Sequence, residues 1–111
     1  MKMVIAFIQP FMADAVAASL HRIDGLTGAT FTDARGFGRG GHHNDRGLEE
    51  VVGTVPKVRV EVIVPDALEE EAVRAIGRAA RTGKHGDGKV IVVGVMRTLR
   101  IATGDEGEAS A

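Results

Sequence analysis

The sequence predicts an α+β fold in which two strand–helix–strand units form one four-stranded antiparallel sheet. Residues 3–35 and residues 58–95 each run from an apolar strand pattern through a helical pattern to a second strand pattern. Apolar residues alternate in strands and recur every three or four positions in helices. Two such halves fit a ferredoxin-like βαββαβ sandwich, with both helices on one face of the sheet and a long loop after the second strand.

In the first unit, a short apolar strand at residues 3–8 stops at Pro10. A helix is expected over residues 12–23, and the second strand over residues 29–35. The face of this helix that packs on the sheet is expected to carry Val16, Leu20 and Ile23.

In the second unit, valines alternate with other residues over 58–64, which predicts a half-buried strand. Asp66 and Glu69 have the spacing of a capping box at the start of the next helix. Gly83 is expected to end that helix in a left-handed cap, before a last strand at residues 89–95. The buried stripe of the helix is expected to consist of Leu68, Ala72, Val73, Ile76 and Ala80.

A length of 111 residues predicts a single domain over residues 1–111. Because 44% of the residues are apolar and only 4% are aromatic, we expect an aliphatic core. Fourteen basic residues nearly cancel fifteen acidic ones, so we expect no nucleic-acid partner. The chain has no cysteine, no leader-like start and no apolar run long enough to cross a bilayer. We therefore expect a cytoplasmic protein that does not insert into a membrane. No nucleophile, base and orienting group occur together, so we assign no catalytic residue and do not expect an enzyme.

Three segments bear on assembly and partners. The strands at residues 3–8 and 90–95 are almost wholly apolar, which predicts that the sheet face away from the helices is covered as well. A partner subunit is the simplest cover, and a C-terminal segment folded over that face is the alternative. Residues 36–55 are polar and glycine-rich, which indicates a mobile loop that contacts a partner or, alternatively, a connection without a task. The tail at residues 102–111 is expected to be frayed or loosely docked.

Two glycine-rich loops indicate anion binding. Residues 36–41 match the dinucleotide-binding pattern G-x-G-x-x-G, but the residues that follow cannot begin the helix that this pattern requires. Residues 83–89 match the Walker pattern G-x-x-x-x-G-K, but they lead into a strand, and Val90 occupies the position of the magnesium-binding Ser or Thr. Neither loop is therefore a Rossmann turn or a Walker loop. Their glycines still expose backbone N–H groups, and Arg39 and Lys89 can pair with phosphate.

Several separate motifs together resemble the PII nitrogen-regulatory signalling proteins over the whole chain. They occur in the order and at nearly the spacing of that family, which makes them more specific than one glycine loop. The motifs are Gln9-Pro10-Phe11, Gly36-Phe37-Gly38-Arg39, Pro56-Lys57-Val58, Ala80-Arg81-Thr82-Gly83-Lys84, Gly86-Asp87-Gly88-Lys89 and Arg100-Ile101. The resemblance implies a homotrimer of ferredoxin-like subunits that binds ATP, ADP or AMP between neighbours, with Mg²⁺ as an optional companion and no obligatory cofactor.

The resemblance also implies which residues would bind the nucleotide. Those from one subunit are Gly36, Phe37, Gly38, Arg39, Glu61, Val64, Gly86, Asp87, Gly88 and Lys89. Those from its neighbour are Gly28, Ala29, Thr30 and Arg100. The long loop would then report the ligand state by docking on an effector protein, such as an enzyme, a regulator, a membrane transporter or an efflux system.

The chain departs from the family pattern at several positions. No tyrosine is present and Glu50 occupies about the place of the modifiable one, so uridylylation there is excluded. Gly40 replaces the loop glutamine that joins magnesium and 2-oxoglutarate to ATP, and Gln9 replaces a lysine. Lys57 remains as a binding group for a carboxylate effector, but without its partners it does not predict strong 2-oxoglutarate binding. Ala102 replaces an arginine that contacts phosphate in the family. Because one phosphate contact is lost, we expect ADP or AMP to compete with ATP for the site.

The short loop and the missing tyrosine are similar to a divergent PII branch encoded beside heavy-metal efflux systems. The residues of this loop expected to contact a partner are His42, His43, Asn44, Asp45, Arg46, Glu49 and Glu50. His42 and His43 are also candidate metal ligands, which makes a metal-responsive sensor or accessory protein of an efflux system the alternative function. A solvated polar loop without metal is the favoured interpretation, because metal binding would cost the entropy of ordering the loop. A second alternative is a weak ATPase or phosphotransferase.

Overall fold

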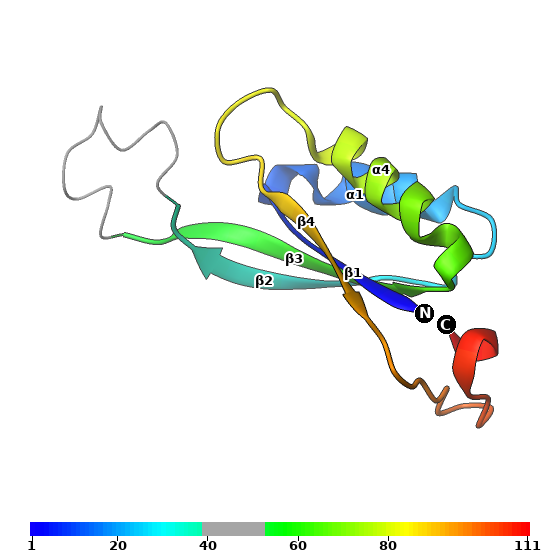
Figure 1. Cartoon of the computed structure of the whole chain (residues 1–111). Coiled ribbons are helices and arrows are strands. Elements are labelled where there is room, and N and C mark those ends of the chain that lie inside the picture. The colour runs from blue at the N-terminus through cyan, green and yellow to red at the C-terminus, as the bar shows by residue number, and fades with distance from the viewer. Residues whose placement is uncertain (39–52) are drawn as a thin grey trace.

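The computed structural model describes residues 1–38 and 53–111. The elements follow the predicted order, and Figure 1 shows them as one sheet with a layer of helices. They are β1 (Lys2–Ile8), η1 (Pro10–Met12), α1 (Ala13–His21), β2 (Thr30–Gly36), β3 (Val55–Val64), η2 (Asp66–Leu68), α4 (Glu69–Ala80), β4 (Lys89–Gly94) and η3 (Gly107–Ser110).

The four strands form one antiparallel sheet in the order β2-β3-β1-β4. Both helices lie on the same face of this sheet and pack against each other (Figure 1). The two repeats therefore interlock, because the first strand of each repeat lies in the centre of the sheet. This arrangement confirms the predicted ferredoxin-like sandwich.

The core lies between the sheet and the helices and is aliphatic, as the composition predicted. Val60 of β3, Val16 of α1 and Ile76 of α4 are all fully buried in it. The alternation in β3 sends Val58, Val60, Val62 and Val64 to this core and leaves Lys57, Arg59, Glu61 and Ile63 on the opposite face. The strand register therefore decides which candidate residues can meet on each face.

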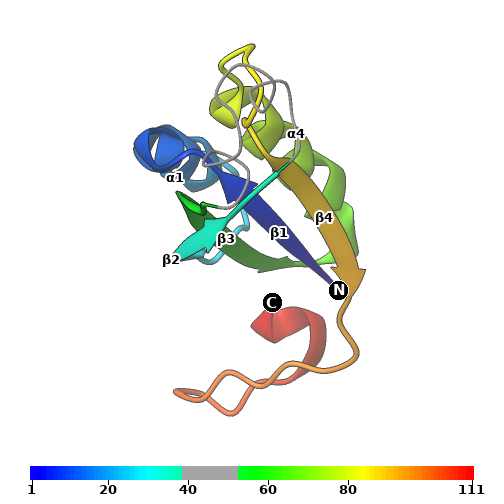
Figure 2. The ribbon, with the colours of Figure 1, turned by 90° about the vertical axis from the view of Figure 1, so that its left-hand side faces the viewer.

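The face of the sheet away from the helices is partly open. Ile5 is only 8% exposed, whereas Ile91 and Val93 on the neighbouring edge strand are 37% and 38% exposed. The C-terminal segment does not cover these side chains in the way the alternative required: it runs past the end of β4 and returns to the N-terminus (Figure 2). The two termini lie side by side in both views.

The tail is more ordered than the sequence predicted. Leu99 and Glu106 form an antiparallel bridge, and η3 follows. The carbonyl oxygen of Ala111 accepts a hydrogen bond from Thr27 Oγ1 at 3.1 Å, and Ala111 is only 6% exposed. The small, acidic residues of the tail did not predict this docking, because the groups that the tail contacts lie far away in the sequence.

The helix ends correct three expectations. The first helix is shorter than residues 12–23, since a 3-10 turn precedes it and it ends at His21. Asp66 does not cap the second helix: its carboxylate pairs with the Met1 amino group at 2.8 Å and with Lys2 Nζ at 3.2 Å. Gly83 does adopt a positive φ of 86°, but the helix has already ended at an extended Arg81.

In residues 1–38 and 53–111, none of the helices combines the length and apolar character needed to cross a membrane.

Candidate functional site

The glycine loop between α4 and β4 has a backbone conformation that strongly favours glycine. Gly86 has φ +89° and Gly88 has φ +102°, both in the left-handed region. A Cβ atom on Gly88 would lie 1.7 Å from the carbonyl oxygen of Phe7 in β1. The two glycines therefore let the loop press against the strand end, and they leave backbone N–H groups uncovered by side chains.

Asp87 holds this loop in shape from within. Its Oδ2 accepts hydrogen bonds from the backbone N–H groups of Thr82 at 2.8 Å and Gly83 at 3.0 Å, and its Oδ1 accepts one from the Thr82 hydroxyl. These bonds, the one from the Thr82 side chain first, hold the pKa of the Asp87 carboxyl below its ordinary range. Asp87 therefore stabilises the conformation of the loop, since its carboxylate already accepts hydrogen bonds from these donors.

Lys57 joins the glycine loop to the base of the long loop. Its Nζ donates a 2.6 Å hydrogen bond to the carbonyl oxygen of Gly86. Lys57 lies two residues after Val55, where the chain returns from the long loop and pairs with Gly36. The structure thus brings three sequence-predicted elements together: the end of β2, Lys57 and the glycine loop. It also adds Gln9, whose amide nitrogen would lie 3.1 Å from a Cβ on Gly86.

A row of two cations and an aromatic ring crosses the open face of the sheet beside this loop. The register pairs Lys89 with Phe7, and Phe7 with Arg59. The Arg59 guanidinium lies over the Phe7 ring, 5.5 Å from its centroid, and its Nη2 pairs with Glu61 Oε2 at 2.8 Å. In the described part of the chain, no carboxylate lies within ion-pair distance of Lys89, which is exposed.

Phe7 and Arg59 were missed by the motif-based reasoning, and strand alternation would have found them. They occupy the same face as Glu61 and Lys89, each at an even spacing along its strand or directly across from it. The same alternation separates Glu61 from Val64, whose side chain is fully buried on the helix side. Val64 is thus not accessible to a ligand in one protomer, and the apolar neighbour of Glu61 on its own face is Ile63.

The remaining candidates lie apart from the glycine loop within one protomer. Phe37 is 63% exposed beyond the end of β2, at the base of the long loop, followed by Gly38. Gly28, Ala29 and Thr30 are exposed around the opposite end of β2, and Arg100 lies in the C-terminal segment beyond β4. One protomer does not bring these last four residues to its own glycine loop.

Residues of the long loop lie outside the described residues. They include Arg39, the candidate metal ligands His42 and His43, and the partner-contacting set Asn44, Asp45, Arg46, Glu49 and Glu50. Among residues 1–38 and 53–111, no group of three or more potential ligand side chains is arranged to hold a metal ion.

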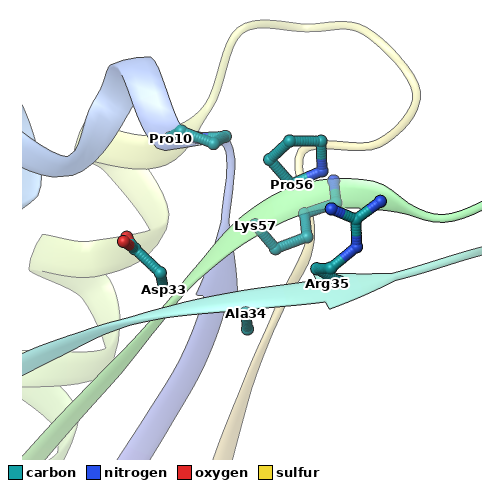
Figure 3. Close-up of a pocket in the computed structure, with 6 residues that line it drawn as sticks. All are labelled: Pro10, Asp33, Ala34, Arg35, Pro56 and Lys57. Carbon is teal, nitrogen blue, oxygen red and sulfur yellow. The ribbon is translucent and has the colours of Figure 1, made fainter.

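A cavity of about 500 Å³ opens beside the base of the long loop. Figure 3 shows Asp33 and Arg35 pointing from β2 to the side where Pro10 lies, and Ala34 pointing the other way. Arg35 Nε donates a 2.9 Å hydrogen bond to Thr54 Oγ1, which ties the two strands together where the long loop leaves and returns. The cavity is lined by Pro10, Asp33, Ala34, Arg35, Pro56 and Lys57.

Comparison with known proteins gives the same family as the sequence motifs. Residues 1–105 match the family described as Nitrogen regulatory protein P-II. The chain is 48% identical to the nitrogen regulatory protein P-II of Rhodospirillum rubrum over 109 residues, which cover 96% of each chain. It is 45% identical to the nitrogen regulatory protein P-II 1 of Escherichia coli K12 over 112 residues, which cover 99% of each chain. These names describe regulatory proteins, in agreement with the expectation that the chain is not an enzyme. The match over nearly the whole length shows that the chain belongs to the P-II family of nitrogen regulatory proteins.

Proposed function

We propose that this protein is a signalling regulator that binds an adenine nucleotide between the subunits of a homotrimer and controls a partner protein through residues 36–55. The observation that carries the proposal is the contact of Gly88 with Phe7. It fixes a loop of positive-φ glycines beside an exposed lysine, and such a loop presents backbone N–H donors and a cation to a phosphate chain.

The phosphates would lie along the glycine loop. The N–H groups of residues 86–88 and the Lys89 ammonium supply donors, and Arg39 would add a planar guanidinium from the base of the long loop. Asp87 would keep these donors in place without contacting the anion itself, since three donors already hold its carboxylate. The preference for ATP over ADP or AMP would depend on how many cations contact the phosphates. Since position 102 is alanine and not arginine, ADP and AMP would compete better with ATP here than in a site with that arginine.

The base and ribose would lie across the open face of the sheet. Glu61 supplies a carboxylate whose orientation is set by Arg59, and Phe7 and Ile63 supply apolar surface on the same face. The second carboxylate oxygen of Glu61 accepts no hydrogen bond from the described residues, so it can accept one from a ligand hydroxyl or amino group.

A neighbouring subunit would complete the cleft. Gly28, Ala29, Thr30 and Arg100 lie away from the glycine loop of their own chain, so they can serve a nucleotide only at the loop of another. Ile91 and Val93 provide exposed apolar surface on the same face, and Met96, Leu99 and Ile101 are exposed in the C-terminal segment that follows β4. Apolar side chains exposed in such a group are typical of a subunit interface.

The signal would pass through Lys57. A nucleotide that shifts Gly86 changes the acceptor of the Lys57 ammonium, and Lys57 lies in the strand that carries the returning end of the long loop. Binding would thereby favour one arrangement of residues 36–55, and a partner would be held or released accordingly.

Isothermal titration calorimetry with ATP and ADP tests the proposal. We expect Lys89→Ala and Arg39→Ala each to weaken nucleotide binding by about tenfold or more, because each removes a charge-assisted hydrogen bond to phosphate. Arg74→Ala is the matched control, since Arg74 is an exposed helix cation that pairs with Glu70 on the other layer. Unchanged affinity in both site variants would refute the nucleotide site.

A further inference from the structure

Two segments of one chain must keep a fixed position relative to each other if both are to reach one nucleotide in the cleft of a neighbour. One is the connection between α1 and β2, which carries Gly28 and Ala29, and the other is the C-terminal segment, which carries Arg100. Neither Gly28 nor Arg100 lies in a helix or a strand. Their relative position therefore depends on contacts outside the sheet and the helices.

The C-terminal turn, which we define as residues 107–111, docks on the connection between α1 and β2. Thr27 Oγ1 donates a 3.1 Å hydrogen bond to the backbone oxygen of Ala111, which is only 6% exposed. No other side chain of residues 22–29 forms a hydrogen bond or ion pair with the described part of the chain. Gly28 follows directly, and glycine has more backbone freedom than any other residue. The bond to Ala111 therefore restrains the connection just before Gly28.

The same turn also holds the segment of Arg100, where the chain turns back after β4 (Figure 2). The Gly107 N–H donates a 3.2 Å hydrogen bond to the carbonyl oxygen of Thr98, and the hydroxyl of Thr98 forms a hydrogen bond with that of Ser110. The Arg100 N–H donates to the carbonyl oxygen of Asp105 at 2.8 Å, which closes the turn beyond Thr98. The Arg100 side chain has no hydrogen-bond or ion-pair partner in residues 1–38 and 53–111. Its backbone is thus held, while its guanidinium stays available to another molecule.

We propose that the C-terminal turn positions the connection between α1 and β2 relative to Arg100, so that both reach the same nucleotide in the cleft of a neighbouring subunit. Thr27 and Thr98 are the positioning residues, since each joins one of the two segments to the turn. The inference rests on the proposed nucleotide site between subunits. Holding both segments in place before the ligand arrives removes the cost of ordering them from the free energy of binding.

Amide NMR spectra of the ¹⁵N-labelled full chain without nucleotide test the link itself. Thr98→Val replaces the hydroxyl with a methyl group, and we expect it to shift the signals of Gly28 and Ala29 on the far side of the turn. Ser19→Ala is the matched control, because the Ser19 hydroxyl also donates to a backbone oxygen, that of Ala75 at 3.2 Å, and is also partly buried. It should leave the signals of Gly28 and Ala29 in place. Unshifted signals of both residues in Thr98→Val would overturn the proposal, whether or not the protein binds nucleotides.

Calorimetry with ATP tests the consequence for binding. Thr27→Val and Thr98→Val are each expected to weaken binding about threefold to tenfold, the effect of one lost hydrogen bond. Thr27→Ser, which keeps the hydroxyl, and Ser19→Ala should bind as the wild type does. No ATP binding by the wild type would overturn the nucleotide site and this inference with it. Wild-type binding with unchanged affinity in Thr27→Val or in Thr98→Val would overturn this inference alone.

The double variant shows whether Thr27 acts through the C-terminal turn or by contacting the nucleotide itself. If both threonines act through the turn, Thr27→Val should weaken ATP binding less than twofold further in a chain that already carries Thr98→Val, because the two changes release the same element. A hydroxyl of Thr27 that contacts the nucleotide directly would make the two effects multiply. Multiplication of the two single effects would therefore overturn the positioning role.

Discussion

Gly88 and the carbonyl oxygen of Phe7 are in contact so close that a Cβ atom on residue 88 would lie 1.7 Å from that oxygen. Gly88→Ala must therefore displace the loop from β1 or strain the backbone at φ +102°. We expect the free energy of unfolding to fall by about 1–3 kcal/mol, measured by chemical denaturation. Gly94→Ala is the control, because a Cβ there meets nothing within 4 Å. Equal stability of the two variants would show that the close contact does not constrain the loop.

The hydrogen bond from Lys57 to Gly86 should restrain the glycine loop. In Lys57→Met we expect faster amide hydrogen exchange over residues 86–88, and a stability loss of only about 0.5–1.5 kcal/mol, the net value of one hydrogen bond. Lys84→Met, in the same loop, removes a lysine whose side chain donates no hydrogen bond to the described residues and should leave exchange unchanged. Similar exchange in both variants would contradict the link between the glycine loop and β3.

The ion pair between Asp66 and the Met1 amino group should make stability depend on pH at both ends of the range. The hydrogen bond to Met1 and then the one to Lys2 hold the pKa of Asp66 below its ordinary value of 3.8, so this contribution is present above that pH and is lost as the pH falls. Asp66 raises the pKa of the Met1 amino group above its ordinary value of 8.0, so this contribution is present below pH 8 and is lost as the pH rises further.

We therefore expect the melting temperature of Asp66→Asn to depend less on pH than that of the wild type, below about pH 4 and above about pH 8. Thermal unfolding over a pH series measures this, on protein with the native N-terminus. Asp24→Asn removes a carboxylate elsewhere on the surface and should keep the wild-type profile. A wild-type profile in Asp66→Asn would show that the pair contributes no pH-dependent stability.

The exposed side chain of Ile91 should be buried in the assembly. Ile91→Asp would place a charge in the proposed interface, and we expect it to convert the proposed trimer to a particle of one 11.7 kDa chain. Light scattering after size exclusion measures the mass. Arg78→Asp, which introduces the same residue at an exposed position of α4, should remain trimeric. A trimer in both variants would place the interface elsewhere.

The sequence was sufficient for the fold because local pattern and tertiary packing agree. The valines of β3 alternate with other residues, and the buried residues of α4, such as Ile76, recur at helical spacing. The sequence pattern therefore predicts which face of each element is buried. Asp66 was misread for the opposite reason. The pattern of a capping box is local, but the groups that pair with this carboxylate, on Met1 and Lys2, are distant from it in the sequence.

The candidate site was predictable only in part. The cluster of glycines identifies the loop from the sequence, because glycine adopts a positive φ at the lowest cost, and Gly86 and Gly88 do so in the structure. The contacts of the loop with Gln9 and Lys57, and the stacking of Arg59 on Phe7, depend on strand register, which motif spacing does not encode. The residues that would complete the cleft, such as Arg100, depend on a second subunit and so cannot follow from the packing of one chain.

The most direct measurement of the central claim uses trimers assembled from two variants. Lys89→Ala and Arg100→Ala chains are given different tags, mixed by refolding, and purified through both tags. In a cyclic trimer of both chains, one cleft joins an intact Lys89 to an intact Arg100 of its neighbour. We predict that calorimetry finds one ATP per mixed trimer at the wild-type affinity, and weak binding in either variant alone. Mixed trimers that bind ATP no better than the separate variants would contradict a nucleotide site shared between subunits.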